Sequence, residues 1–229
     1  MRSVADSLAP AFVLHRRPYS ETSLILEVFT AEHGRVGLLA KGARRRNSKG
    51  AGALQPFQTL LVSWRGRGEL PTLTSVEPDG HAQSLSGNNL VSGFYINELL
   101  MRLLERHDPH PELWNPYQQT VARLTADNSP EPALRYFEKH LLAAIGYGLE
   151  LTVDSQGHPI ATGQSYIYDP ERGARADDGP DAISGATLLA LEHETLDTTT
   201  LPEAKRLMRR LLHRRLDGKP LVSRTLLRQ

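Results

Sequence analysis

The sequence contains no cysteine, and this one absence excludes several classes of protein. Without a thiol there is no disulfide, no thiolate catalysis, and no zinc or iron–sulfur site built on cysteine ligands. No apolar run reaches the roughly 18 residues that a membrane span needs, and no apolar signal-peptide core follows the N-terminus. We therefore expect a soluble protein of the cytoplasm that makes no contact with membranes.

Catalytic motifs are missing as well. The chain has no GxSxG nucleophile elbow, no GxxxxGK[ST] phosphate loop and no GxGxxG after a strand. His107 and His110 are flanked by prolines, which exclude the helical geometry of a zinc protease, so residues 107–110 are interpreted as a helix-ending turn. We expect no enzyme, no bound metal and no cofactor.

One enzymatic alternative remains open in the acidic stretch from 151 to 200. Carboxylate oxygens are the ligands that Mg²⁺ prefers, and four aspartates there are suitable by chemistry, although they lie among glycines and prolines. These residues are Asp169, Asp177, Asp178 and Asp181. A metal-dependent nuclease or other hydrolase is the hypothesis they leave.

The net charge of +1 hides a strong segregation along the chain. Residues 1–80 carry 11 basic and 7 acidic side chains, residues 151–200 carry 2 and 9, and residues 201–229 carry 9 and 2. Two basic regions around an acidic middle are typical of a protein that binds polyanions over part of its surface. The alternative is a set of ordinary solvated faces.

The first 80 residues predict short strands separated by turn signals. The expected strands are 12–15, 22–30, 35–40, 58–64 and 70–76. Five short strands are too few for a sandwich but suit a small closed barrel, of which the five-stranded OB-fold is the first candidate. Within this region Trp64 is either a core aromatic or a stacking platform for an unpaired base.

From residue 88 the apolar period changes from two to about 3.6, which predicts helices. They are expected at 88–106, at 113–124, from Ser129 (N-cap) and Pro130 to Gly146, and, after a polar stretch with one strand-like piece at 165–168, at 186–195 and 202–215. The predicted class is α+β: an N-terminal OB-fold barrel (1–80), a mostly α-helical domain (81–151), and a C-terminal region (152–229) with a small irregular or β insertion.

Basic residues without any acidic neighbour fill the segment from 35 to 68. Residues 41–52 read as a loop because glycine, serine and asparagine interrupt any regular pattern. Each phosphate that a flexible basic loop neutralises releases a condensed counterion, so the segment predicts DNA binding. The predicted contacts are Arg35, Lys41, Arg44, Arg45, Arg46, Lys49, Arg65 and Arg67, joined by Arg16 and Arg17 at the end of the first strand.

A second basic stripe lies on the last predicted helix, 202–215, where its residues alternate with apolar residues at helical spacing. Its predicted DNA contacts are Lys205, Arg206, Arg209 and Arg210. Two other interpretations stay open: the stripe binds an acidic protein, or it pairs with the acidic segment that precedes it.

Four stretches, taken in order, resemble the RecO family of bacterial recombination mediators. They are LHRRPYSETS (14–23), AKGARR (40–45), YINELL (95–100) and IGYGLEL (145–151), and the similarity extends from about residue 10 to residue 229. The resemblance implies binding to single- and double-stranded DNA, annealing of complementary strands, and help in loading RecA during recombinational repair. It also implies RecR and the acidic tail of single-stranded-DNA-binding protein as partners.

The resemblance raises two further expectations. Many relatives carry a four-cysteine zinc site after the segment that matches GYGLEL, whereas this chain has residues 152–158 (TVDSQGH) there and must hold its shape by packing alone. For the acidic tail we expect a cationic rim beside an apolar pocket, made by Arg123, Arg135, Lys139 and Leu142. Pairing of Arg135 and Lys139 with Glu131 and Glu138 on the helix surface is the alternative. For the whole chain, the alternative is a scaffold whose basic patches bind acidic proteins instead of DNA.

Overall fold

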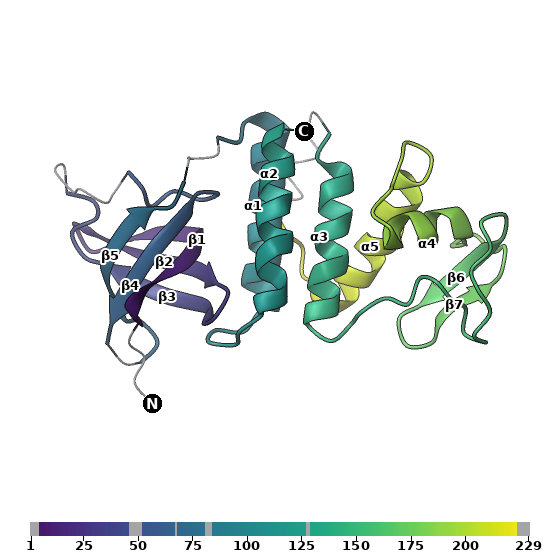
Figure 1. Cartoon of the computed structure of the whole chain (residues 1–229), viewed down its shortest axis with the longest axis horizontal. Helices are drawn as coiled ribbons and strands as arrows, with labels where there is room; N and C mark the ends of the chain where they lie inside the picture. The colour runs from purple at the N-terminus through teal and green to yellow at the C-terminus, as the bar shows by residue number, and fades with distance from the viewer. Residues whose placement is uncertain (1–4, 46–51, 67, 81–83, 127–128, 224–229) are drawn as a thin grey trace. The chain divides into compact units, whose positions relative to one another are not determined.

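A computed structural model describes residues 5–45, 52–66, 68–80, 84–126 and 129–223. Five strands close a barrel in the order β1-β2-β3-β5-β4, which confirms the predicted five-stranded barrel of OB type (Figure 1). Neighbouring strands are antiparallel except β3 and β5, which meet in parallel at Leu39 and Thr72. The strands are β1 (Ala5–Tyr19), β2 (Ser23–Thr30), β3 (Gly34–Ala40), β4 (Thr59–Arg65) and β5 (Thr72–Pro78).

The barrel interior is filled by aliphatic side chains from every second strand position, among them Leu26, Val28 and Leu60. Trp64 belongs to this core at 2% exposure, so its interpretation as a core aromatic is confirmed and the stacking platform is wrong. Strand β2 is buried along its whole length because its outer face is covered too. There Phe29 packs against the rings of Trp114 and Tyr117.

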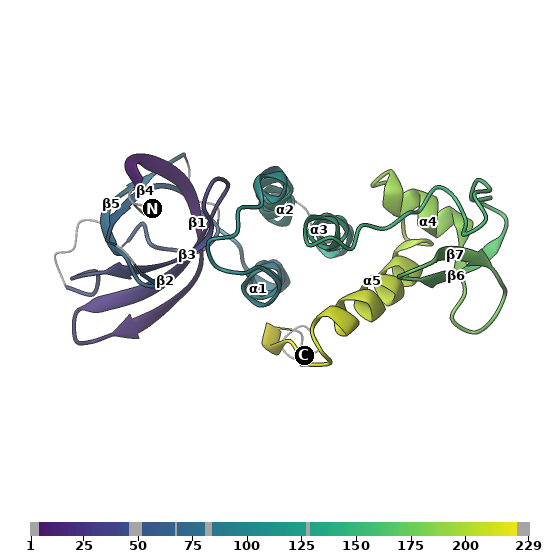
Figure 2. The same cartoon turned by 90° about the horizontal axis from the view of Figure 1, so that it is seen from below.

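Two helices of the same unit, α1 (Gly87–Leu103) and α2 (Trp114–Ala126), cover this side of the barrel (Figure 2). A short 3₁₀ turn, Pro111–Leu113, leads into α2, and residues 107–110 form the predicted connection. A buried chain of hydrogen bonds joins the parts: the Tyr117 hydroxyl donates to Asn97 (2.7 Å), whose amide donates to the Leu14 carbonyl (2.9 Å). Burial raises the pKa of Tyr117 far above its ordinary value, so this hydroxyl stays a donor.

The second unit contains three helices and a small sheet in the order β7-β6-β8. Its elements are α3 (Glu131–Ala144), β6 (Ser165–Asp169), β7 (Gly173–Ala176), β8 (Ile183–Ser184), α4 (Gly185–Glu192) and α5 (Leu201–Arg215). Two strands accompany the single strand-like piece that the sequence predicted. The expected N-cap at Ser129 is wrong: Pro130 is the N-cap, without a side-chain hydrogen bond, and the helix begins one residue later than predicted.

These compact units divide the chain elsewhere than the predicted boundaries at 80 and 151. Helices α1 and α2 belong with the barrel, whereas α3 belongs with α4, α5 and β6–β8. Ser223, near the end of the described chain, returns to the first unit, where its backbone and hydroxyl both donate to the Glu98 carboxylate (2.9 and 2.7 Å). None of the helices in the described ranges is long and apolar enough to cross a membrane.

Candidate nucleic-acid interface

Six predicted DNA contacts are exposed at the ends of β1, β3 and β4. We call them the basic rim: Arg16, Arg17, Lys41, Arg44, Arg45 and Arg65. Strand pairing brings them together, because Ile25 of β2 pairs with Arg17 on one side and with Leu39 on the other. On the far side of β3, Thr72 pairs with both Leu39 and Arg65. Glu21, in the turn between β1 and β2, and Glu69, in the loop that follows Arg65, are exposed carboxylates in the neighbouring loops.

Local hydrogen bonds hold the centre of the rim in place. The backbone N–H of Arg44 donates to the Thr22 carbonyl (2.8 Å), and its guanidinium donates to the Ser20 carbonyl (3.0 Å). The segment after β3 is thereby tied to the turn between β1 and β2. OB barrels bind oligonucleotides with this turn and with the β4–β5 loop, which begins after Arg65, so the rim lies where the fold places its ligands.

The other binding surface of OB barrels, the outer face of β2 and β3, is covered here by the chain itself. The Arg35 guanidinium donates to the Met101 carbonyl at the end of α1, and that of Arg106 donates to Glu27 on β2. Close approach is possible at Gly34, where an added Cβ would lie 1.9 Å from the carbonyl oxygen of Asp108. Nucleic acid therefore has access to the rim but not to this face.

Arg35 is consequently a poor candidate for a DNA contact, and we correct that prediction. Its side chain is 15% exposed and lies 4.0 Å from the carboxylate of Glu27. Burial lowers the pKa of Arg35 from its ordinary value, whereas the hydrogen bond to Glu27 raises the pKa of Arg106. Both guanidinium groups serve the packing of α1 on the barrel. Arg46, Lys49 and Arg67 lie outside the described residues.

The basic stripe on α5 is partly used within its own unit. Lys205 donates to Glu131 (2.7 Å), and Arg210 donates to the Tyr168 carbonyl (3.3 Å). Arg206 is exposed and only reaches the Ala182 carbonyl at 3.4 Å. Arg209 is exposed, with no partner among the described residues. Of the four predicted contacts on α5, Arg206 and Arg209 thus remain exposed, and Arg214 near the end of the helix is exposed as well.

The expected site for an acidic tail does not form a surface on α3. Arg135 is 4% exposed and pairs with Glu138 at 2.8 Å, and Leu142 is 1% exposed. Lys139 donates to the Glu192 carbonyl (2.7 Å). Arg123, on α2, belongs to the other unit. We therefore correct the prediction for Arg135 and Leu142: the pairing of Arg135 with Glu138 named as the alternative is present, but buried.

Residues 152–158 stand where the resemblance implies a zinc site in many relatives, and this region of the chain does not fit that metal. The chain has no cysteine, and no group of three or more potential ligands that can hold a metal ion is found in the described ranges. Instead the Asp154 carboxylate accepts hydrogen bonds from the backbone N–H groups of Gln156 and His158 (both 2.8 Å). Buried Tyr166 and Tyr168 use their hydroxyls to cap backbone N–H groups at Ala161 and Glu150.

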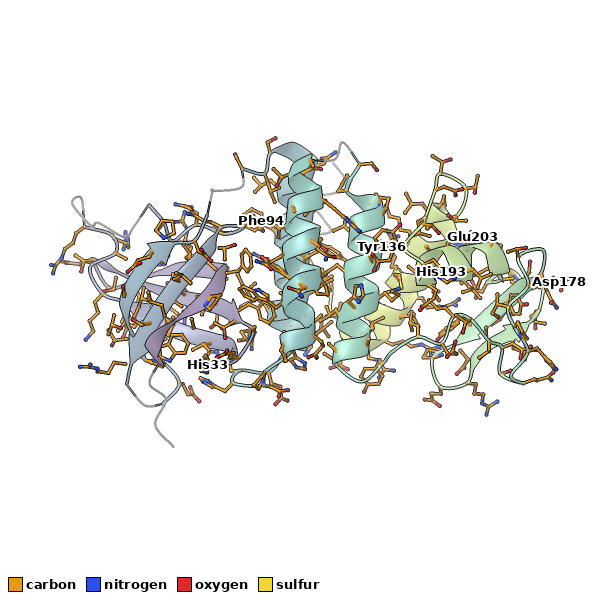
Figure 3. All side chains as sticks on the ribbon, viewed as in Figure 1. His33, Phe94, Tyr136, Asp178, His193 and Glu203 are labelled. Atoms are coloured by element: carbon orange, nitrogen blue, oxygen red, sulfur yellow. The ribbon has the colours of Figure 1, made fainter. Side chains whose placement is uncertain are left out.

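Two of the four aspartates of the hydrolase hypothesis have structural roles, Asp169 and Asp177, whereas Asp181 is exposed. Asp169 accepts from the backbone N–H groups of Glu171 and Arg172, which lowers its pKa. Asp177 binds the Arg175 guanidinium (2.5 Å) and the Gly179 N–H (3.0 Å). Asp178 is exposed (Figure 3). The hydrogen bonds of Asp169 and Asp177 close turns, which explains why these two carboxylates occur in this segment.

One feature of the site was not predicted from the sequence. Phe94, labelled in Figure 3, lies within the apolar helix predicted at 88–106, but it is 42% exposed and borders a groove on the first unit. The same groove is lined by Arg16 of the basic rim and by Phe57. Period alone does not distinguish an apolar residue that faces the core from one at the edge of the stripe.

Comparison with known proteins finds one family along nearly the whole chain. The sequence matches the family descriptions "Recombination protein O N terminal" over residues 1–80 and "Recombination protein O C terminal" over residues 85–225. It is 51% identical to the DNA repair protein RecO of Methylococcus capsulatus, over 95% of this chain and 91% of that protein. Identity is 49% with the namesake of Alkalilimnicola ehrlichii (96% and 90% covered) and 47% with that of Coxiella burnetii (96% and 97%).

Proposed function

The chain belongs to the RecO family of DNA repair proteins, and from this premise we propose that it binds single- and double-stranded DNA through the basic rim of its barrel. The observation that carries the proposal is the position of six exposed cations beside the loops with which OB barrels bind oligonucleotides. Such a surface holds phosphates and leaves the base edges free to pair. We therefore propose strand annealing without catalysis of a chemical step.

The same proposal includes the protein partners that the family suggests. We propose that the chain acts with RecR, recognises the acidic tail of single-stranded-DNA-binding protein, and so helps to load RecA during recombinational repair in the cytoplasm. Since Arg135 and Leu142 are buried, the exposed Arg206 and Arg209 of α5 are the better candidates for the tail. An acidic peptide matches their charge.

The test of DNA binding is the salt dependence of affinity. Each phosphate contact contributes about 0.7 to the slope of log affinity against log salt for single strands, so the double variant Arg44→Ala/Arg45→Ala should flatten that slope by about 1.4. The matched control is Arg172→Ala/Arg175→Ala, which removes the same charge from exposed positions of the second unit.

The control separates a rim contact from a general effect of net charge. An unchanged slope in the folded rim variant, or an equal change in the control, contradicts binding at the rim. If the wild-type chain binds acidic proteins but shows no salt-dependent affinity for DNA, the scaffold alternative holds instead.

A further inference from the structure

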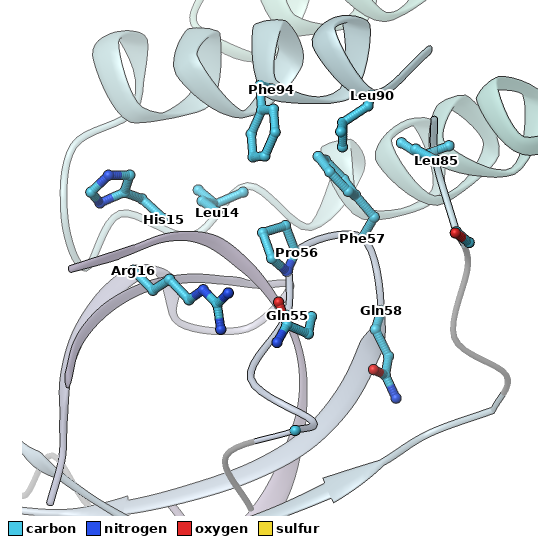
Figure 4. Close-up of a pocket in the computed structure, with 12 residues that line it drawn as sticks. Leu14, His15, Arg16, Gln55, Pro56, Phe57, Gln58, Leu85, Leu90 and Phe94 are labelled. Atoms are coloured by element: carbon cyan, nitrogen blue, oxygen red, sulfur yellow. The ribbon is translucent and has the colours of Figure 1, made fainter. Parts of the chain in front are cut away.

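A groove of about 600 Å³ opens on the first unit between β1, the segment before β4, and α1 (Figure 4). Its walls combine two aromatic rings with polar groups. Phe57 and Phe94 contribute the rings, while Arg16, Gln55 and Gln58 contribute hydrogen-bonding groups. The groove shares Arg16 with the basic rim, and its other lining residues lie outside the rim.

Phe94 is held as a partly open aromatic platform. Its ring lies edge-on to that of Phe57, with centroids 5.4 Å apart and planes at 62°. Phe57 is itself buried at 4% exposure and has a φ of +66°, an unusual backbone conformation for a bulky residue. The absent side chain at Gly93 makes room for it, since an added Cβ would lie 2.7 Å from the Phe57 ring. The supporting ring is therefore fixed, and 42% of Phe94 remains exposed above it.

The polar side chains that line the groove are a guanidinium, two amides, an imidazole and a hydroxyl, those of Arg16, Gln55, Gln58, His15 and Ser84. Arg16 is exposed and donates to the Leu54 carbonyl at 3.3 Å, which directs the guanidinium along the groove wall. Gln55 is exposed beside it, and each glutamine amide offers both donors and an acceptor. Among the described residues that line the groove there is no carboxylate. The site thus suits a ligand with an aromatic face, hydrogen-bonding edges and a negative charge nearby.

We propose that this groove takes an unpaired nucleobase of a single DNA strand, stacked on Phe94 while the adjoining phosphate lies at Arg16. The inference rests on the proposed DNA binding and specifies it. Bases within a duplex are already stacked on each other, whereas an unpaired base has a free face for an aromatic side chain. The groove therefore gives the chain a preference for single strands. The rim does not supply this preference, because it contacts only phosphates.

The experiment compares three DNAs of equal length at one salt concentration: a single-stranded oligothymidylate, the same oligonucleotide with abasic sites, and a duplex. For Phe94→Ala we expect affinity for the oligothymidylate to fall about 5- to 100-fold, the usual loss for one stacking platform. Affinity for the abasic strand and the duplex should stay within about twofold of wild type, since their phosphate contacts are unchanged.

Two further variants keep the test sharp. Phe94→Tyr preserves an aromatic platform and should bind like wild type, whereas Phe94→Leu preserves only apolar bulk and should lose affinity like Phe94→Ala. The control Leu8→Ala removes an equally exposed apolar residue (40%) of the barrel that does not line the groove. Circular dichroism melts confirm that each variant is folded.

Several results would overturn the proposal. An equal loss for all three DNAs, or no loss for any, shows that no base is stacked on Phe94. If Phe94→Ala abolishes instead the binding of an acidic peptide with an apolar end, the groove takes peptide. In each case salt-dependent binding by the wild type, with a flatter slope for Arg44→Ala/Arg45→Ala, still supports the proposed function, so the two failures remain distinguishable.

Discussion

The guanidinium of Arg106 donates two hydrogen bonds to the carboxylate of Glu27, which stands 79 residues earlier on the outer face of β2. Arg35 lies on the other side of the same carboxylate, at 4.0 Å, and donates to the Met101 carbonyl. This arrangement closes the face that OB barrels commonly offer to oligonucleotides. The exposed cations of the rim and the open groove beside Phe94 are the parts of the barrel unit that remain available for DNA.

We expect Arg106→Ala to lower the free energy of unfolding by about 1–3 kcal/mol, because the 9%-exposed Glu27 loses its charged donors. Urea denaturation measures this loss. Arg102→Ala is the matched control: its side chain is 34% exposed against 35% for Arg106, but its partner Glu98 is 17% exposed and keeps two hydrogen bonds from Ser223, so the expected cost is below about 1 kcal/mol. A double-mutant cycle with Glu27→Gln that gives no coupling would contradict the argument.

The barrel could be predicted because the sequence signals for its strands and turns are local. Alternating apolar residues and glycine-bearing turns mark each strand, and the predicted ends differ from the observed ones by only one or two residues for β2 to β5. β1 is longer than predicted because it extends to pair with both β2 and β4. Such pairing depends on partners far away in sequence.

The candidate site was predictable only in part, for the same reason. An arginine pattern predicts charge, but the exposure of each arginine depends on the fold: Arg35 donates to the Met101 carbonyl, 66 residues on, and Arg135 is 4% exposed beside Glu138. Two rim arginines stay exposed although each reaches a backbone carbonyl, Arg44 that of Ser20 and Arg16 that of Leu54. The exposure of Phe94 was not predicted, because helical period places it on an apolar helix but does not show that its ring stands beside Phe57 at an open groove.

The role of Gly93 can be tested by Gly93→Ala. Alanine gains about 1 kcal/mol over glycine in a helix interior, but here its Cβ would lie 2.7 Å from Phe57 and 2.8 Å from Leu85. We expect the overlap to outweigh that gain and to lower stability by about 1 kcal/mol net, measured by thermal denaturation. Gly163→Ala, where an added Cβ meets no described atom within 4 Å, should be neutral or slightly stabilising. A stabilised Gly93→Ala would show that Phe57 is not held against the helix.

The start of α5 depends on the charge of Asp197. One carboxylate oxygen accepts from the hydroxyls of Thr199 and Thr200 (2.7 and 2.8 Å) and from both of their backbone N–H groups (2.9 Å each). These bonds, led by the Thr199 hydroxyl, hold the pKa of Asp197 well below its ordinary value. A carboxyl whose pKa is lowered on folding stabilises the protein above its unfolded pKa of about 3.9 and loses this effect as the pH falls further.

Asp197→Asn should therefore lower the urea midpoint of the chain at pH 7 and at pH 5 by the same amount. The difference from wild type should shrink only below about pH 4, where this carboxylate begins to be protonated in the unfolded chain while it stays charged in the folded protein. Asp178→Asn, at an exposed position of the same unit, serves as the control and should leave the midpoint unchanged (Figure 3). A difference that is equal at all pH values would mean that the charge of Asp197 plays no part.

Binding of the acidic tail should depend on α5. We expect Arg206→Glu/Arg209→Glu to reduce affinity for the tail peptide of single-stranded-DNA-binding protein by at least about tenfold, because like charges then face each other. Fluorescence anisotropy of a labelled peptide measures it. Arg135→Gln should instead lower stability by about 3–5 kcal/mol, since it breaks a buried ion pair with Glu138. Native peptide affinity in the folded α5 variant would place the tail elsewhere.

Annealing should need neither nucleotide nor metal-dependent chemistry from this chain. Two complementary oligonucleotides repel each other through their phosphates, and cations on a rim that leaves the bases free lower this barrier. When both strands are coated with single-stranded-DNA-binding protein, we expect addition of the present chain to accelerate pairing. The quenching of a fluorophore on the end of one strand measures the rate. The rate should be the same with and without ATP, because the sequence contains no phosphate-binding loop. It should fall for Arg44→Ala/Arg45→Ala but not for Arg172→Ala/Arg175→Ala, and a strict requirement for ATP hydrolysis by the purified chain would refute the mechanism.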